Sequence, residues 1–467
     1  MKILNSLKKY KKNIALISEK KKITYSELNK LSENLSKSLD KNILTFLICE
    51  NDFETVIFYL STLKQKSTVL LLEKNITKTN LEELVNRYQP RYIFHKDKKK
   101  IKLYNFNLKK KFMNYNLLEN RKKIENEINK DLRLLIPTSG TTGSPKYVKI
   151  TKQNLDSNII SIQKYLKLRK TDCVITTLPM NYVYGLSVIN SHLFVGAKIV
   201  LNELSIFDKK FWILLSTNKV TNINGVPFLY EILEKINFLK KDLSSIRFFT
   251  QAGGHINKQT QKKLIYFCKK NKKKIFFMYG AAEATARMSY LPWQYAYQKI
   301  GSIGKPIQGG KFWLENEKGI KIEQNKKIGQ LIFKGKNVSP GYAEGYYDLA
   351  KHKNNYILQT GDYAKRDNDG FYFLLGRSDK FIKIQGNRLN LSDIELYLSG
   401  LGIKSVCKLN RENKISVFIE KNINETMILK KIREKITIHP NNFLIKKIDR
   451  FPLNKNLKIS YNHKVFN

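Results

Sequence analysis

The chain has 467 residues, and its 86 lysines and arginines outnumber its 39 aspartates and glutamates, giving a formal net charge of +47. This length exceeds what one hydrophobic core usually serves and predicts two or three domains. A hydrophobic content of 42% is typical of a globular protein, and no apolar run reaches the ~18 residues of a membrane span. No apolar signal region follows the basic N-terminus, so we expect a cytoplasmic protein without a membrane span.

The excess of lysine is the most unusual bulk property. A charge of this size attracts polyanions, such as nucleic acid, an anionic membrane or an acidic partner protein. Compositional drift is the alternative, because the lysines are dispersed along the chain together with many asparagines and isoleucines. No nucleic-acid-binding motif accompanies the charge. The sequence therefore favours drift and predicts no specific nucleic-acid partner.

The N-terminal part alternates between strand-like and helical patterns. A helix capped by Ser26 and a second helix over Phe53–Lys64 are predicted between strand-like runs that include Ile43–Cys49 and Thr68–Leu72. Alternation of this kind builds a parallel sheet with helices on its faces. The region from 93 to 130 carries runs of lysine, and we expect solvated loops and a polar helix there.

An apolar strand over Leu132–Pro137 leads into a loop rich in glycine and hydroxyl groups. Small residues allow several backbone N–H groups to point at one anion, and Lys146 adds a positive charge. The lysine follows a proline, so the order differs from that of a Walker-type loop. The pattern favours a phosphate-binding loop over a surface linker. Its candidate phosphate ligands are Thr138, Ser139, Gly140, Thr141, Thr142, Gly143 and Lys146.

At this loop the chain resembles the adenylate-forming superfamily, which contains acyl-CoA synthetases, adenylation domains of peptide synthetases and luciferases. The resemblance implies a large ATP- and acyl-binding domain over 1–378 and a small mobile domain over 379–467. The expected fold is α/β: parallel-rich sheets with flanking helices and a β unit in the large domain, and an α+β small domain. Asp379 is implied as the hinge.

An aromatic segment after the next strand is the expected wall of the acyl pocket. The resemblance implies that Tyr182, Tyr184 and Gly185 lie there, although core packing would also explain them. Amino-acid-activating members carry an aspartate here for the substrate's ammonium, and this chain has Gly185 instead. An ammonium buried without a counter-ion costs several kcal/mol. The sequence therefore favours a fatty or other non-amino acyl substrate, and fatty acid metabolism as its setting.

The resemblance implies that two glycine-bearing segments lie beside the nucleotide. Gly253 and Gly254 follow a strand-like run, and the lack of side chains would let the flat adenine approach the backbone. A second apolar strand ends at Tyr279, whose ring offers a stacking face. Gly280 and Ala281 follow it and complete the expected nucleotide contacts.

One carboxylate follows this second strand. Glu283 can ligate Mg²⁺, which prefers hard oxygen ligands and bridges ATP phosphates. The superfamily has a threonine just before this glutamate, and Ala282 stands there instead. The change removes one hydroxyl donor, which costs about 1–2 kcal/mol of phosphate binding. Thr285 is a partial replacement to be examined.

The resemblance assigns further residues in the last third of the chain. It implies that Asp362 holds the ribose diol and that Arg377 supports the ribose and the phosphate. Lys458 matches the catalytic lysine, which neutralises charge between the acyl carboxylate and the α-phosphate. Leu457 replaces the usual glycine before it. Thr138 and Glu283 are the other implied catalytic residues, and a turn aspartate and a surface lysine are the plainer interpretations of Asp362 and Lys458.

Together these assignments imply an AMP-forming acid–thiol ligase. ATP and Mg²⁺ would activate a small carboxylic acid to acyl-AMP and release pyrophosphate, and the thiol of CoA or of a carrier's phosphopantetheine would accept the acyl group. An acidic acyl carrier protein is the expected protein partner. Two alternatives stay open: an amino-acid-activating ligase for a carrier protein, and a nucleotide-binding homologue without ligase activity, which Ala282 and Leu457 favour.

Overall fold

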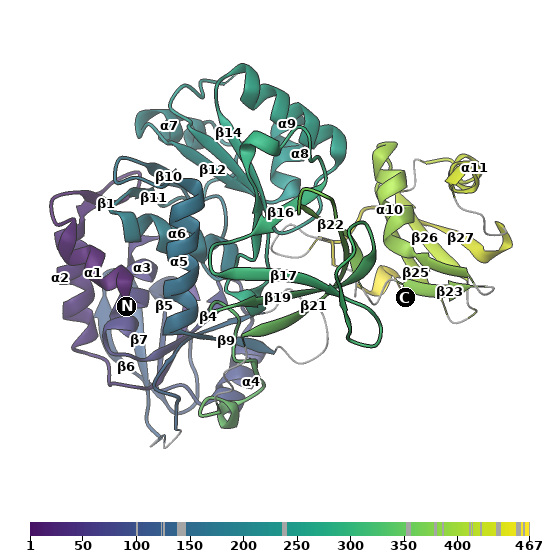
Figure 1. Ribbon diagram of the computed structural model, residues 1–467. Coiled ribbons are helices and arrows are strands. Elements are labelled where there is room, and N and C mark those ends of the chain that lie inside the picture. Colours follow the sequence, from purple (N-terminus) through teal and green to yellow (C-terminus); the bar gives the residue numbers. More distant parts are fainter. Residues whose placement is uncertain are drawn as a thin grey trace.

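The computed structural model shows a large N-terminal part with a small C-terminal part beside it (Figure 1). The described residues are 1–99, 101–122, 124, 127–137, 146–235, 241–351, 356–377, 381–384, 387–410, 412, 414–420, 423–435, 440–453, 459–460 and 463–466. None of the helices in these ranges combines the length and the apolar character that a membrane crossing requires.

One large sheet runs through the large part. Its fourteen strands are, in spatial order, β18 (Lys321–Ile322), β17 (Gly310–Glu315), β19 (Ile328–Gly335), β21 (Ile357–Arg366), β22 (Tyr372–Arg377), β16 (Ser302–Pro306), β15 (Ser289–Leu291), β14 (Lys274–Tyr279), β13 (Phe248–Gln251), β12 (Asn222–Gly225), β10 (Cys173–Ile175), β11 (Lys198–Val200), β1 (Ile14–Ile17) and β2 (Lys22–Thr24). In this spatial order, the neighbouring strands from β14 through β13, β12, β10 and β11 to β1 pair in parallel. The neighbouring strands from β14 to β18 pair antiparallel and form the predicted β unit.

A second sheet contains the strands β3 to β9 together with β20. Its eight strands are, in spatial order, β20 (Tyr342–Ala343), β9 (Tyr147–Thr151), β8 (Leu132–Pro137), β4 (Thr68–Glu73), β3 (Leu44–Cys49), β5 (Tyr92–Lys96), β7 (Tyr115–Asn120) and β6 (Phe106–Phe112). The prediction of loops and a polar helix over 93–130 is wrong, because β5, β6 and β7 form there. One of the lysine runs that suggested a solvated region, Lys109–Lys111, lies on β6, an exposed edge strand, where charged residues prevent pairing with another chain.

The helices of the large part are α1 (Lys2–Lys9), α2 (Tyr25–Ser36), α3 (Phe53–Lys64), α4 (Lys78–Tyr88), α5 (Lys152–Leu166), α6 (Val183–Val195), α7 (Lys209–Thr217), α8 (Pro227–Lys235) and α9 (Lys258–Lys270). The bounds predicted for α3 are confirmed. The predicted cap Ser26 is wrong, because Thr24 caps α2 in a reciprocal pair with Glu27. Helices α3 and α6 are apolar and buried on nearly all sides, and they share one hydrophobic core with strands of both sheets.

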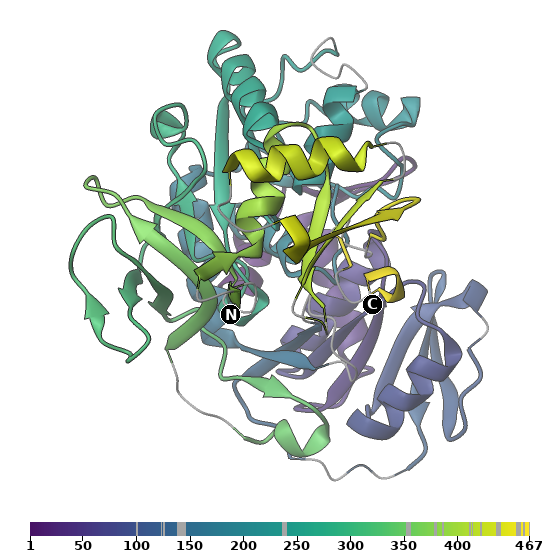
Figure 2. The same cartoon turned by 90° about the vertical axis from the view of Figure 1, so that its right-hand side faces the viewer.

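The small part is α+β, as predicted. It contains a two-stranded sheet of β23 (Phe381–Ile384) and β24 (Asn387–Asn390), a three-stranded sheet of β25 (Ser405–Leu409), β26 (Ile415–Glu420) and β27 (Phe443–Ile448), and the helices α10 (Leu391–Gly400) and α11 (Glu425–Lys435). Its main hydrophobic core is separate from those of the large part. Figure 2 views the molecule with this part in front of the large one. The predicted boundary at 378/379 and the hinge Asp379 lie outside the described residues.

Candidate active site

A cavity of about 1420 Å³ lies where the large part meets the small part. Its walls come from the loops after β13 and β14, from β21 and β22, and from α10 and β25. Loops at the carboxyl ends of parallel strands are the usual ligand-binding edge of an α/β sheet. Ten residues singled out in the sequence line this one cavity: Lys146, Tyr182, Gly253, Gly254, Tyr279, Gly280, Ala281, Glu283, Asp362 and Arg377.

A tyrosine, an aspartate and an arginine form the polar wall on the β21 side. The hydroxyl of Tyr279 donates a hydrogen bond to Oδ2 of Asp362, and Nη1 of Arg377 lies 3.8 Å from Oδ1 of the same carboxylate. The Asp362 side chain is 13% exposed and faces the cavity. Burial raises the pKa of Tyr279, and the charge of Asp362 raises it further, so the hydroxyl stays a donor.

Asp362 lies inside β21, opposite Arg377 of β22, and not in the turn of its plainer interpretation. The strand is irregular at this point. Gly361 has a φ of +72°, and the register shifts between Tyr363 and Ala364. A residue with a side chain disfavours that φ, so the glycine allows the strand to turn the carboxylate toward the cavity.

Glu283 lies in a short 3₁₀ helix, η3 (Ala282–Ala284), directly after β14. Its Oε1 accepts a hydrogen bond of 2.8 Å from the hydroxyl of Tyr342 in β20. The preceding Gly280 cannot carry a side chain, because a Cβ there would lie 1.7 Å from the carbonyl oxygen of Ala286. The absence of a side chain at Gly280 therefore allows the backbone at Ala286 to pack directly against this position.

The donor set fits Mg²⁺ held mainly by a nucleotide. Within the described ranges no group of three or more His, Cys, Asp or Glu side chains forms a metal site by itself. Mg²⁺ commonly takes one or two carboxylates and completes its shell with phosphates and water. The single carboxylate of Glu283 matches that requirement. Thr285 does not replace the hydroxyl missing at Ala282, because its Oγ1 is buried and donates to the carbonyl of Asn337 at 2.8 Å.

Lys146 is the last residue of the predicted phosphate loop, and its Nζ forms an ion pair of 2.6 Å with Glu344. Both side chains are about half exposed, at 50% and 59%, so the pair is accessible to an incoming anion. Exposed pairs of this kind are worth less than ~1 kcal/mol. A phosphate group can therefore compete with Glu344 for the lysine. The other loop residues, Thr138–Gly143, and the predicted catalytic Lys458 lie outside the described residues.

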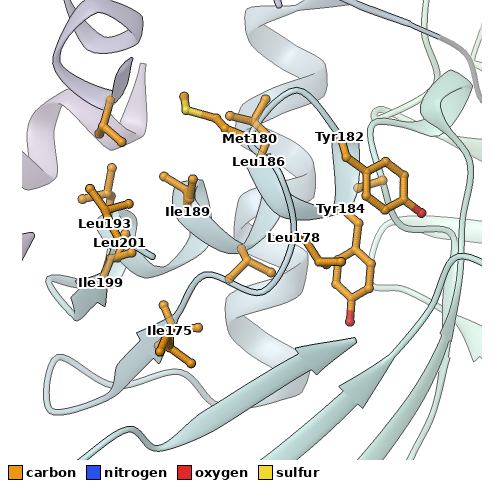
Figure 3. Close-up of a cluster of buried hydrophobic side chains, with 14 of the residues drawn as sticks. Ile175, Leu178, Met180, Tyr182, Tyr184, Leu186, Ile189, Leu193, Ile199 and Leu201 are labelled. Atoms are coloured by element: carbon orange, nitrogen blue, oxygen red, sulfur yellow. The ribbon is translucent and has the colours of Figure 1, made fainter. Parts of the chain in front are cut away.

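The three residues expected at the acyl pocket separate into two groups. Tyr182 lines the cavity. Tyr184 is 1% exposed, and its hydroxyl lies 2.7 Å from Oγ1 of Thr250. Figure 3 shows both rings on the side of the apolar cluster away from Leu193 and Leu201.

Gly185 does not line the cavity either, because it packs against the backbone. A Cβ at this position would lie 2.3 Å from the carbonyl oxygen of Pro179. The expectation that Tyr184 and Gly185 face the substrate is therefore corrected: one is a buried packing residue, and the other permits close approach of α6 to the preceding turn.

Several residues of the site carry no sequence signal of their own. Tyr342 belongs to a turn-like segment and reaches Glu283 only through the pairing of β20 with β9. Glu231 of α8 and Glu395 of α10 add two carboxylates to the cavity wall. Residue spacing along the chain does not predict that these three residues reach the cavity, because they lie on elements that are far apart in sequence.

Comparison with known proteins assigns the chain to a family. The family model described as AMP-binding enzyme matches residues 4–343. The chain is 26% identical to 2-succinylbenzoate–CoA ligase of Bacillus pumilus over 398 residues, which cover 82% of this chain and 79% of the relative. It spans 53% of the length of a Bacillus cereus enzyme of the same name, at 30% identity.

Solved structures show the same fold. o-Succinylbenzoate CoA synthetase of Bacillus subtilis, in complex with its acyl-adenylate intermediate, has a TM-score of 0.79 at 20% identity, covering 99% of this chain and 97% of that one. The same enzyme in complex with ATP and magnesium ion has a TM-score of 0.78 at 20% identity, with coverage of 99% and 98%. These findings confirm the fold class and the resemblance to adenylate-forming enzymes. By the match over residues 4–343, the chain belongs to the AMP-binding enzyme family.

Proposed function

We propose that this protein is an ATP-dependent acid–CoA ligase, which activates a carboxylic acid as acyl-AMP and then transfers the acyl group to the thiol of CoA. The observation that carries the proposal is the convergence of Lys146, Glu283, Asp362 and Arg377 on one cavity. These residues come from four separate segments, and each has the chemistry that one portion of ATP requires. The relatives of known name perform this class of reaction.

In the proposed complex, Asp362 and Arg377 hold the ribose and the adjoining phosphate. Carboxylate oxygens accept hydrogen bonds from a diol, and a guanidinium donates to phosphate oxygens. Lys146 binds the pyrophosphate end, and Glu283 holds Mg²⁺, which would neutralise charge on the phosphates. Gly253 and Gly254 leave room for the adenine against the loop after β13.

The reaction needs little covalent work from the protein. An acid oxygen attacks the α-phosphorus, and pyrophosphate leaves, so the residues act by holding the two reactants in line and by balancing charge. Lys458 is the proposed cation between the carboxylate and the α-phosphate. The small part would then turn about Asp379 and present the CoA channel.

The relatives of known name act on 2-succinylbenzoate, and we propose this aromatic acid as the first substrate to test in place of a fatty acid. ATP–pyrophosphate exchange is measured with 2-succinylbenzoate, benzoate, octanoate and phenylalanine. CoA and a pantetheine-bearing carrier protein are then compared as acceptors. Exchange that is strongest with 2-succinylbenzoate, followed by thioester formation with CoA, is the expected result. No exchange with any acid, while ATP binds by calorimetry, would point to a nucleotide-binding protein without ligase activity.

Amino-acid activation is the second candidate function, and one observation favours it. Glu231 places a carboxylate on the cavity wall, where an ammonium group requires one. Phenylalanine tests this candidate in the same panel. Exchange with phenylalanine that is lost with its deaminated analogue, 3-phenylpropanoate, would select it.

A further inference from the structure

A buried arginine lies behind the wall of the proposed acid pocket. Arg287 follows η3 and precedes β15, and 3% of its surface is accessible. The chain reaches it through two residues with positive φ, Thr285 at 51° and Ala286 at 94°. Ala286 lies in a region that residues with a Cβ rarely adopt, so this turn is maintained at a cost. The turn directs the following arginine into the interior.

The charge of Arg287 is not balanced by a carboxylate in the part of the chain that the structure describes. Nη1 donates a hydrogen bond of 3.1 Å to the carbonyl of Ala286, while Nε is buried and has no hydrogen-bond partner. Arginine does not lose its proton inside proteins, so it cannot escape the cost of burial by becoming neutral. A buried guanidinium in this condition is complementary to an anion that the protein alone does not supply.

Two side-chain contacts connect this guanidinium to the cavity. It lies 4.1 Å from the ring centre of Tyr184, and that ring packs edge-on against Tyr182, which lines the cavity. The guanidinium also interacts with Tyr165, whose hydroxyl donates to the sulfur of Met278 at 2.9 Å, and Met278 also lines the cavity. Burial raises the pKa of Tyr165 to about 12, and the nearby charge of Arg287 opposes that shift. Two successive rings, Tyr184 and Tyr182, therefore separate the charge from the acid pocket.

We propose that Arg287 supplies the positive charge that selects acids with a second, non-reacting carboxylate. The inference rests on the proposed function and names its substrate class as dicarboxylic acids. Aromatic rings screen a charge poorly, so the attraction acts across the Tyr182–Tyr184 layer. The reacting carboxylate faces the nucleotide side, where Glu283 and Asp362 lie, and the second carboxylate faces Tyr182. The same charge disfavours an ammonium group at this end of the pocket and gives a fatty acyl chain no advantage.

The test compares one diacid with two analogues that lack its second charge. The substrates are 2-succinylbenzoate, 4-oxo-4-phenylbutanoate, which lacks the ring carboxylate, and the ring carboxamide of 2-succinylbenzoate. We expect the wild-type kcat/KM for the diacid to exceed that for either analogue by at least about tenfold. A preference below threefold overturns the inference, while exchange with the acids leaves the proposed function standing. Absence of ATP–pyrophosphate exchange with every acid would contradict both the inference and the proposed function.

Substitution of the arginine assigns the preference to its charge. In Arg287→Met we expect the diacid preference to fall at least about tenfold while kcat/KM for 4-oxo-4-phenylbutanoate changes less than threefold. Arg287→Lys keeps the charge and is expected to retain most of the preference. Equal losses with all three substrates would show a structural role alone and overturn the inference.

Arg247→Met is the matched control. Arg247 also stacks on an aromatic ring, that of Phe248 at 5.0 Å, but it pairs with Asp172 and does not line the cavity. Its loss is expected to lower the melting temperature and to leave the diacid preference unchanged. If Arg287→Met does not fold, the comparison of wild type with Arg287→Lys on the diacid and the carboxamide decides the question.

Discussion

At the scale of single residues, Asp362 shows how one carboxylate can serve both the protein and a ligand. Oδ2 accepts from Tyr279, and Nη1 of Arg377 lies 3.8 Å from Oδ1. A carboxylate has about four lone-pair positions, so it can accept from several donors at once. Tyr279 and Arg377 fix the orientation of the carboxylate before any ligand arrives, which lowers the cost of binding.

Asp362→Asn therefore tests the ribose assignment with little change in shape. The amide keeps one acceptor oxygen, but it loses the charge and places an NH₂ group against either Tyr279 or the ligand. Hydrogen bonds to charged groups are worth about 1.5–3 kcal/mol, so we expect ATP affinity to fall by roughly 10- to 150-fold. Isothermal titration of ATP into the variant measures this loss.

The control for this variant is Asp367→Asn. Asp367 pairs with Lys299 at 2.7 Å just after β21 and does not line the cavity. Its substitution is expected to leave ATP affinity within about twofold of wild type, because this partly buried pair lies outside the cavity wall. Equal losses in the two variants would contradict the role given to Asp362.

At the scale of elements, the sequence predicted those segments whose signals are local. Helix α3 has an Asp52 cap and an apolar run, and α5 is capped by Thr151, so spacing and capping agree with the tertiary structure. The β5–β7 region was missed because β6 places its lysines on an exposed edge, where the apolar alternation is lost. A local sequence pattern does not predict which strand will lie at the edge of a sheet.

The residues of the candidate site also fall into those with a local sequence signal and those that depend on tertiary packing. Glycine-bearing loops after apolar strands predicted Gly253, Gly280 and Glu283, since such loops need no distant partner to be recognised. The separation of Tyr182 from Tyr184 was not predictable, because it depends on how tightly α6 packs against the turn before it. Arg287 was missed for a related reason: only the fold reveals that an arginine lies unpaired in the interior.

Helix α6 also contains a histidine that links stability to pH. His192 is 1% exposed, with Nδ1 2.8 Å from the carbonyl of Val188 and Nε2 3.1 Å from the amide nitrogen of Asn222. A carbonyl only accepts and an amide nitrogen only donates, so this arrangement requires the neutral ring. Burial lowers the pKa of His192 from 6.5 to about 4.

Because the folded protein binds this proton less readily than the unfolded chain, its contribution to stability is complete above pH 6.5. That contribution is lost as the pH falls from 6.5 toward 4. Between pH 7.5 and 5.0 we expect His192 to account for about 2 kcal/mol of lost unfolding free energy. Urea unfolding of the wild type and of His192→Asn at both pH values measures the difference.

His192→Asn is expected to be less stable at pH 7.5 but to lose about 2 kcal/mol less than the wild type on acidification. The exposed His463 provides the comparison, and His463→Asn is expected to keep the wild-type dependence on pH. An unchanged pH dependence in His192→Asn would contradict the neutral, buried state of this ring.

At the scale of the whole molecule, the cavity exists because two separately packed parts meet. One contact between them is made by Nδ2 of Asn257, which donates to the carbonyl of Ser399 at 2.7 Å and to its Oγ at 3.4 Å, at the end of α10. Asn257 also caps α9, because its Oδ1 accepts from the backbone N–H of Gln259 at 2.7 Å. One side chain therefore uses its oxygen for the large part and its nitrogen for the small part.

Because the two atoms have separate roles, a substitution at Asn257 can remove the contact with Ser399 and keep the cap of α9. In Asn257→Asp the cap oxygen stays, while the donor toward Ser399 becomes a carboxylate oxygen that faces a carbonyl. Loss of a hydrogen bond together with this repulsion is worth about 1–2 kcal/mol, so we expect amide exchange at the Ser399 end of α10 to accelerate by roughly 5- to 30-fold. Exchange in α9 should stay within twofold of wild type, whereas Asn257→Ala, which loses the cap as well, should accelerate both helices. If hydrogen exchange by mass spectrometry shows α10 equally protected in Asn257→Asp and wild type, other contacts hold the small part in this orientation, and the walls of the cavity do not depend on Asn257.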